Sequence, residues 1–491
     1  MKLFLTSFVA VIVASLWYFR INIFETLIER KNCEAARNCE DTRKFTYWPV
    51  VLDQWNKNDN LRSMKRVFDR MGFRMVNGSE EHWDIMWSIE FPFDSFPEKI
   101  TNSTIKPNQR INHFPGTPFI GNKLALVTTL ESEYILPAFS FPKDEKRFKR
   151  FIEEHPEARF VEKNYDNRGV QLVPKSVIQQ GFSRENKFLQ VFLDNPLLID
   201  GHAFDIGMYV LITSIDPLVF YRYKPECLFR FCSEPYHPFD PKNLKKYVIA
   251  GNKKHAWDMK TFQHLEVQFD FHNLDIFKNY LNKNGHDVEA LFKKFDDAIV
   301  TAITSKINNI VAATQNECKL FKCTNENFFE LFRFDFMIDD QLNVYLMEIN
   351  MSPNMTPSKE EYERNGIHYE QVIYNTLRLI GAEGFVELKD DLRSSQMFSS
   401  SQNIAIDIEA CSGCDDKCES ESCYLCLPCM SEDVREYLKR FYREHNRRGE
   451  FARIFPSAAS VDNENLGSFS EKTQNLALWM SAKCEMDEEW C

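Results

Sequence analysis

The sequence lacks an excess of basic residues, since 60 Lys and Arg stand against 72 Asp and Glu and the formal net charge is −12. Binding to the phosphate backbone of DNA or RNA needs a basic face that displaces counterions. The charge balance therefore argues against a nucleic-acid partner. An acidic protein partner would have to meet a local basic patch.

Internal repeats are also absent, and the chain is not depleted in apolar residues in the way that disordered chains are. Hydrophobic residues make up 44% of the 491 residues and include 43 Phe. This length is too great for one minimal domain but is enough for two or three lobes, each around a sizeable core. We therefore expect a compact multi-lobe protein.

The apolar segment from Leu3 to Tyr18 is followed by Arg20, and it contains no clear small-x-small site for cleavage of a signal peptide. This favours a membrane anchor in residues 1–24 over a cleaved signal peptide. The length of this segment barely suffices to span a bilayer, and residues 21–24 extend it if Arg20 reaches toward the headgroups. Lys2 alone precedes it, whereas four basic residues follow it: Arg20, Arg30, Lys31 and Arg37. This bias places the rest of the chain in the cytosol, with the lumen of the secretory pathway as the alternative.

Fourteen cysteines are many for a cytosolic chain, where disulfides rarely persist. Six of them lie in residues 411–429, CSGCDDKCESESCYLCLPC. The ends of this segment carry two Cys-x-x-Cys pairs whose spacing suits tetrahedral zinc: Cys411, Cys414, Cys426 and Cys429. Disulfides in a luminal chain, or reduced thiols in a loop, are the alternatives. Sequons at Asn77 and Asn102 fit a luminal chain but do not decide the question.

Hydrophobic periodicity predicts strands and helices in mixed order. Strands are expected at 82–93, 158–174 and 187–193, and in two hairpins at 204–224 and 329–355. Helices are expected at 148–154, 288–313, 359–380 and 434–456. The predicted divisions are an N-terminal lobe at 44–130, a central lobe at 131–186, a C-terminal lobe at 187–390, a linker with the cysteine segment at 391–430, and a basic helix at 431–456.

The hairpin at 329–355 carries a possible metal site. Strand alternation places Asp335 on one face of the first strand, and Glu348 and Asn350, two residues apart, share a face of the second strand. Three oxygen ligands of this kind suit magnesium, which leaves its other positions to water and phosphates. Acidic residues on a hairpin are more often a solvated edge, and this alternative stays open.

Seven segments in order resemble the tubulin tyrosine ligase-like family, an ATP-grasp group of amino-acid ligases. They are HWDIMW, QRINHFPG, FVEKNYDNRGVQL, FLDNPLLIDGHAFD, TSIDPLVFYRYK, the hairpin FELFRFDFMID with YLMEINMSPNM, and RRGEFARIFP. They extend over roughly residues 82–456. The resemblance implies an α/β (α+β) fold, with an ATP-grasp-like multi-lobe ligase core behind the N-terminal anchor helix.

The resemblance also implies an activity. ATP and Mg2+ would serve the joining of glutamate to glutamate side chains in the acidic tail of tubulin, through an acyl phosphate, at microtubules or cilia. Asp205 and Arg230 match catalytic residues of the family. Other positions match its ATP-binding residues: Lys123, Lys163, Arg168, Gly169, Asp335 and Asn350. Asp335, Glu348 and Asn350 match its metal ligands.

The chain departs from the family where members usually write Lys-Phe-Asp-Leu-Arg. Here residues 203–207 read Ala-Phe-Asp-Ile-Gly, so two cations are absent. Val191 replaces a lysine near the adenine, and residues 256–258 depart from a leucine-threonine-asparagine segment. Each lost donor removes about 3 kcal/mol of transition-state stabilisation. A weak pseudo-ligase that binds nucleotide as a scaffold at a membrane is therefore the alternative, and His202 and Arg222 are candidates for compensation.

Residues 434–453 form the predicted basic segment. They contain seven Lys or Arg and three Glu, a net charge of +4. Such a segment suits the acidic tail of tubulin. A solvated helix packed by Tyr437, Leu438 and Phe441 is the alternative of equal weight.

Overall fold

The computed structural model describes residues 45–491 with the exception of 52–59, 79–80, 96–104, 123–125, 128–129, 131, 165–168, 175–186, 250–252, 271, 358–364, 383–398, 407–410, 412, 415–417, 419–422 and 463–465. Some predictions fall outside the described residues. They are the anchor at residues 1–24, the ATP-binding residues Lys123 and Arg168, and the sequon at Asn102. No helix within the described part is long and apolar enough to cross a membrane.

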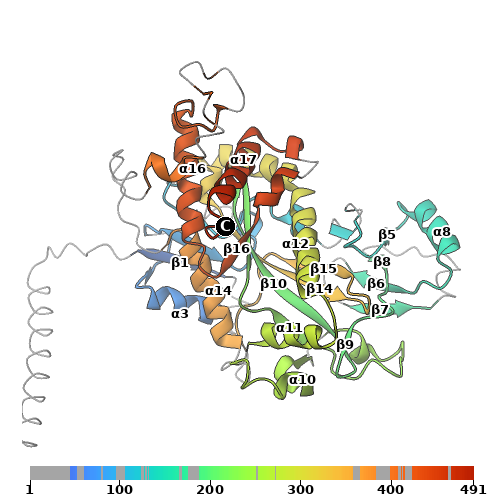
Figure 1. Ribbon diagram of the computed structural model, residues 1–491. Helices are drawn as coiled ribbons and strands as arrows, with labels where there is room; N and C mark the ends of the chain where they lie inside the picture. Colours follow the sequence, from blue (N-terminus) through green and yellow to red (C-terminus); the bar gives the residue numbers. More distant parts are fainter. Residues whose placement is uncertain are drawn as a thin grey trace, which may run out of the picture.

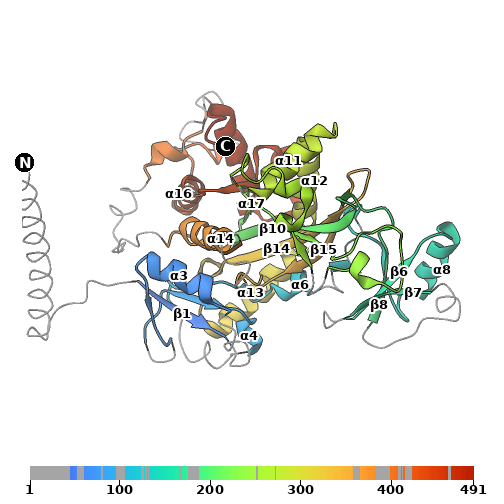
Figure 2. The ribbon, with the colours of Figure 1, turned by 90° about the horizontal axis from the view of Figure 1, so that it is seen from below.

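The fold is a mixed α/β fold with separate sheets. The first sheet is parallel, in the order β2-β1-β3-β4, and belongs to the N-terminal part of the chain. Its strands are β1 (Thr46–Val50), β2 (Arg74–Met75), β3 (Ile85–Ser88) and β4 (Arg110–Ile111). Helix α3 (Arg62–Arg70) lies beside them in Figure 2 and buries Val67 and Phe68.

The second sheet forms the centre of the molecule around β10 (His202–Ile215). This strand pairs antiparallel with β11 (Leu218–Tyr223), β12 (Leu228–Phe231) and β14 (Glu330–Ile338). The sheet continues through β13 (Lys254–His255), β15 (Val344–Asn350) and β16 (Phe451–Phe455). Both predicted hairpins, β10–β11 and β14–β15, are therefore confirmed.

Strand β10 is apolar at nearly every position because helices cover both of its faces. Its even-numbered residues, such as Met208 and Val210, share a core with α11 (Asn273–Lys283) and α12 (Val288–Thr304). Its odd-numbered residues Tyr209 and Leu211 pack with α14, α16 and α17. Figure 1 shows α12 on one side of β10 and α14 with α16 on the other. The bounds of these helices are α14 (Asn365–Leu379), α16 (Glu432–Asn446) and α17 (Glu471–Met486).

A smaller antiparallel sheet in the order β5-β8-β6-β7 lies at the right of Figure 1 with α8 (Glu145–Glu154). Its strands are β5 (Ala138–Ser140), β6 (Phe160–Asn164), β7 (Val170–Val173) and β8 (Lys187–Val191). It has a core of its own made by Phe139, Phe148, Phe160 and Leu189. This sheet faces the central sheet across a pocket described below.

Two predicted helices differ from the structure. The helix expected at 288–313 is two helices, α12 and α13 (Ile307–Phe321), because Thr304 and Ser305 turn their hydroxyls back to the carbonyls of Val300 and Ala302. The basic helix expected at 434–456 ends at Asn446. After Gly449, which has a φ of +52°, residues 451–455 alternate between buried and half-buried and add β16 to the sheet.

The zinc prediction was wrong. Cys411 is bonded to Cys426, Cys414 to Cys423 and Cys418 to Cys429, so the four proposed ligands are all in disulfides. The described residues contain no cluster of three or more His, Cys, Asp or Glu that could hold a metal ion. Two further disulfides join Cys318 to Cys323 and Cys484 to Cys491.

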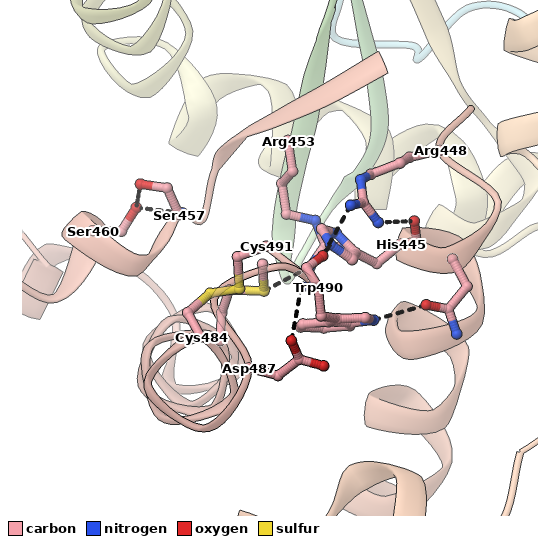
Figure 3. The surroundings of a disulfide bond; sticks show 11 residues. His445, Arg448, Arg453, Ser457, Ser460, Cys484, Asp487, Trp490 and Cys491 are labelled. Carbon is pink, nitrogen blue, oxygen red and sulfur yellow. Dashed lines mark hydrogen bonds between the residues drawn. A yellow bond between two sulfur atoms is a disulfide. The ribbon is translucent and has the colours of Figure 1, made fainter. Parts of the chain in front are cut away.

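The C-terminal disulfide joins Cys484, near the end of α17, to Cys491, and the adjacent Trp490 contacts the end of α16 (Figure 3). The carbonyl of Trp490 accepts hydrogen bonds from His445 Nε2 at 2.8 Å and from Arg448 Nη2 at 2.9 Å. Its indole nitrogen donates to Asn446 Oδ1 at 2.7 Å. The last residues of the chain thus cover the C-terminal end of α16.

Candidate functional site

Four neighbouring strands bring the predicted site residues together. Asp205 on β10 lies opposite Arg230 on β12, and Gly207 on β10 lies opposite Asp335 on β14. Across the hairpin, Asp335 lies opposite Glu348 on β15. Because opposite residues of paired strands share a face of the sheet, all five positions face one side. The prediction that Asp335 and Glu348 share a face is confirmed.

Two aspartates and two arginines form a buried ionic cluster on this face. The Arg230 guanidinium holds Asp205 with both of its arms, from Nε to Oδ1 at 2.8 Å and from Nη2 to Oδ2 at 2.6 Å. The same Nη2 lies 2.9 Å from Asp335 Oδ2. Arg333 holds Asp335 from its own strand, from Nε to Oδ1 at 2.7 Å and from Nη2 to Oδ2 at 2.9 Å. Arg230 therefore bridges both carboxylates.

The two carboxylates differ in pKa. Burial raises the pKa of Asp205 to about 6, and the opposing effect of Arg230 does not cancel the rise. Burial acts on Asp335 as well, but Arg333 and Arg230 together hold its pKa below the ordinary value. Asp335 is thus the firmly ionised member, and Asp205 is the one that can take up a proton near neutral pH.

The donor set fits magnesium by type, since two carboxylates and the amide of Asn350 lie together. Asp335 is already engaged, however. Its two oxygens accept from Arg230, twice from Arg333, and from Asn350 Nδ2 at 2.9 Å, which matches the roughly four acceptor positions of a carboxylate. A magnesium ion held here by Asp335, Glu348 and Asn350 would have to take an oxygen of Asp335 from one of these donors.

A largely apolar pocket adjoins the cluster. It is lined by Val161, Lys163 and Val191 from the smaller sheet and by Ala203, Met337 and Met347 from the central sheet. Ala203 precedes Asp205 by two residues and Met337 follows Asp335 by two, so strand alternation turns these walls toward the same side as the cluster. A flat apolar group could lie between the two sheets with an attached anion beside the arginines.

Two predicted ATP-binding residues belong to the smaller sheet. Lys163 lines the pocket, and its Nζ donates to Gln190 Oε1 at 2.6 Å. Gly169 lies between β6 and β7 with a φ of +87°, where a side chain would be strained. The binding roles of these two residues stay predictions.

Neither of the two cations named from the sequence as candidates for compensation reaches the cluster. Arg222 lies opposite Val210, on the other face of the sheet, where it pairs with Asp296 of α12. His202 is buried, and its Nδ1 is hydrogen-bonded to the carbonyl of Cys232. Arg333 was missed, although its position two residues before Asp335 places both on one face of a strand.

The structure favours the packed form of the predicted basic segment. Lys439 is buried and pairs with Glu436, and Arg440 pairs with Glu326. Arg435 donates to the carbonyl of Leu427, and Arg453 donates to the hydroxyl of Tyr221. These cations serve the protein's own packing, so the segment is a weaker candidate for an acidic partner than its net charge indicated.

Comparison with known proteins gives consistent matches. Residues 101–387 match the tubulin-tyrosine ligase family. The chain is 33% identical over 449 residues to the probable tubulin polyglutamylase ttll-15 of Caenorhabditis elegans, with 88% of this chain and 84% of the relative covered. It is 26% identical to the human tubulin monoglutamylase TTLL4 and 29% identical to the human tubulin polyglutamylase TTLL5. These two alignments cover 81% and 60% of this chain but only 34% and 23% of the relatives.

Proposed function

This chain belongs to the tubulin-tyrosine ligase family, and we propose that it is a protein-glutamate ligase that adds glutamate to glutamate side chains of tubulin. The relatives are named as tubulin polyglutamylases and monoglutamylases. The single observation that carries the proposal is the buried cluster of Asp205, Arg230 and Asp335 beside an apolar pocket between two sheets.

The proposed reaction has two steps. ATP transfers its terminal phosphoryl group to a side-chain carboxylate of the acceptor and leaves as ADP. The amine of the incoming glutamate then attacks the acyl carbon, the phosphate leaves, and the amine loses a proton. No residue of the chain has to form a covalent bond, so the site must supply positioning and positive charge.

Each part of the site has a place in this scheme. The apolar pocket would receive the adenine against Val191 and Ala203, with Lys163 at its wall. Arg230 would neutralise charge on the transferring phosphate while it stays fixed by Asp205. Magnesium, when bound through Asp335, Glu348 and Asn350, would supply further charge to the phosphate oxygens.

Transfer of labelled glutamate to microtubules by the purified chain, with ATP and Mg2+, tests the proposal. The variant Glu348→Gln should abolish incorporation, whereas Glu289→Gln, on the exposed start of α12, should leave it unchanged. Equal incorporation by wild type and Glu348→Gln would contradict the assigned site. ATP binding without any incorporation would instead favour the nucleotide-binding scaffold.

The five disulfides among the described residues favour a second candidate for the acceptor. Disulfides persist in oxidising compartments, so the same ligase chemistry would then act on an acidic protein in the lumen of the secretory pathway. Asn77 of the first sequon is exposed. A shift in mass on glycosidase treatment that Asn77→Gln removes would support the lumen. Rapid alkylation of the six cysteines of residues 411–429 in cells without a reductant would support the cytosol.

A further inference from the structure

The space that a side chain at position 207 would need is filled by Arg333. A Cβ atom built on Gly207 would lie 2.9 Å from Cδ and 3.3 Å from Cγ of Arg333, and 3.1 Å from Oδ1 of Asp335. Carbon atoms at such distances clash, so a side chain at 207 and the present position of Arg333 exclude each other. Arg333 can therefore occupy its present position only because residue 207 is a glycine.

Strand register explains how two residues far apart in the sequence meet. Antiparallel β10 and β14 place Gly207 opposite Asp335 and Tyr209 opposite Arg333. The side chain of Arg333 extends along its own strand past Gly207, and its guanidinium reaches both oxygens of Asp335. The Lys-Phe-Asp-Leu-Arg pattern that residues 203–207 resemble has an arginine at the position of Gly207. That position lies on the same face of the sheet as Arg333, so a guanidinium from either position would reach the same place.

The positive charge of Arg333 balances the charge of the buried cluster. Asp205 and Asp335 carry two negative charges, and Arg230 and Arg333 carry two positive charges, so the buried cluster is formally neutral. The side chains of Asp335 and Arg333 are only 3% and 10% exposed, and solvent screens them little. Without Arg333 the cluster would hold a net negative charge where the phosphates of a nucleotide are expected.

We propose that Arg333 supplies, from β14 and in the space left free by Gly207, the positive charge that balances Asp335, and that this charge keeps the site able to accept the phosphates of a nucleotide. Arg333 acts through Asp335 and is a positioning residue. The inference rests on the proposed function to the extent that the nucleotide is ATP. If Arg333 replaces the charge missing at Gly207, only one of the two cations missing from β10 has no replacement, the one at Ala203.

A reciprocal exchange tests the inference on the full chain. The variants are Arg333→Gly, Gly207→Arg and the double variant Gly207→Arg/Arg333→Gly. ATP affinity is measured by isothermal titration calorimetry with and without Mg2+, and melting temperature is measured alongside. Arg222→Met is the matched control, because it removes a buried arginine that pairs with an aspartate on the opposite face of the same sheet.

We expect each single variant to weaken ATP binding by about tenfold or more, since Arg333→Gly leaves the buried cluster with a net negative charge and Gly207→Arg forces a clash. The ATP affinity of the double variant should return to within about threefold of the wild-type affinity, because this variant restores one guanidinium without the clash. Arg222→Met should lower the melting temperature and keep the affinity for ATP.

Wild-type affinity in Arg333→Gly would overturn the inference, and so would a well-folded double variant that binds no better than the single variants. If Arg333→Gly does not fold, Arg333→Met replaces it, with the same two results decisive. A wild-type chain that binds no ATP overturns both proposals. A chain that binds ATP, shows the rescue and transfers no glutamate retains this inference and refutes only the ligase function.

Discussion

Arg230 should be the most sensitive residue of the ionic cluster, because one guanidinium holds two carboxylates. The variant Arg230→Met leaves Asp205 and Asp335 facing each other in a site where their side chains are 11% and 3% exposed. Removing one partner of a buried ion pair costs about 3 to 5 kcal/mol. Asp205, whose pKa is already raised to about 6, can take up a proton and relieve the repulsion. We therefore expect a loss of about 3 kcal/mol, at the lower end of that range.

Urea unfolding at pH 7.5, followed by tryptophan fluorescence, measures this loss. Arg159→Met is the control, since Arg159 also pairs with an aspartate, Asp194, but both side chains are well exposed, at 40% and 36%. An exposed pair contributes about 0 to 1 kcal/mol. Arg230→Lys should fall between wild type and Arg230→Met, because an ammonium group cannot make the paired contacts of a guanidinium. Equal free energies of unfolding for Arg230→Met and Arg159→Met would refute the reasoning.

Three other predictions concern stability. Acidification from pH 7 to pH 5 should cost about 2 kcal/mol through His445, because burial and two nearby arginines lower its pKa to about 2 and only the unfolded imidazole takes up a proton below its ordinary pKa of 6.5. Urea titrations at both pH values should show a loss that is smaller by this amount in His445→Asn, and an equal pH dependence would contradict the assignment. His113→Ala should cost about 3 kcal/mol or more, since it removes the imidazole 2.8 Å from the fully buried Glu330 and leaves that carboxylate with only the neutral donors of Phe114 and Thr117. Calorimetry that shows a change under 1 kcal/mol would exclude this. Cys484→Ser should cost about 2 kcal/mol through loss of loop closure, and an unchanged melting temperature would show that the C-terminal contacts hold without the bond.

The two central hairpins could be predicted because their signal is local. Apolar residues fill β10 and β14, and short polar turns separate each from its partner strand. The break between α12 and α13 was missed because apolar residues keep their helical spacing across it. Hydroxyl groups there bond to carbonyls one turn back, a competition that hydrophobic periodicity does not detect. In FARIF, the sequence of strand β16, large apolar residues occupy every second position, which predicts a strand. The helical pattern of the basic residues before it favoured a continuous helix instead.

The cysteines show a different limit. Two Cys-x-x-Cys pairs favoured zinc because cysteines at this spacing can bind one metal ion together. In the structure, each of these cysteines instead forms a disulfide with a cysteine more distant in the sequence. Which thiols meet depends on how the segment folds. Spacing alone leaves many pairings open, and the choice between metal and disulfide is made by tertiary structure.

The charge of the candidate site was misjudged for a related reason. A motif compares one position at a time, and at position 207 it reports a lost arginine. The paired strands place Arg333 against that position, so the guanidinium enters from β14 and the charge is retained. One absent donor, at Ala203, then remains in place of two, which lowers the expected deficit in transition-state stabilisation from about 6 to about 3 kcal/mol. Ligase activity is a stronger expectation for this chain once residues that face each other across the sheet are counted together.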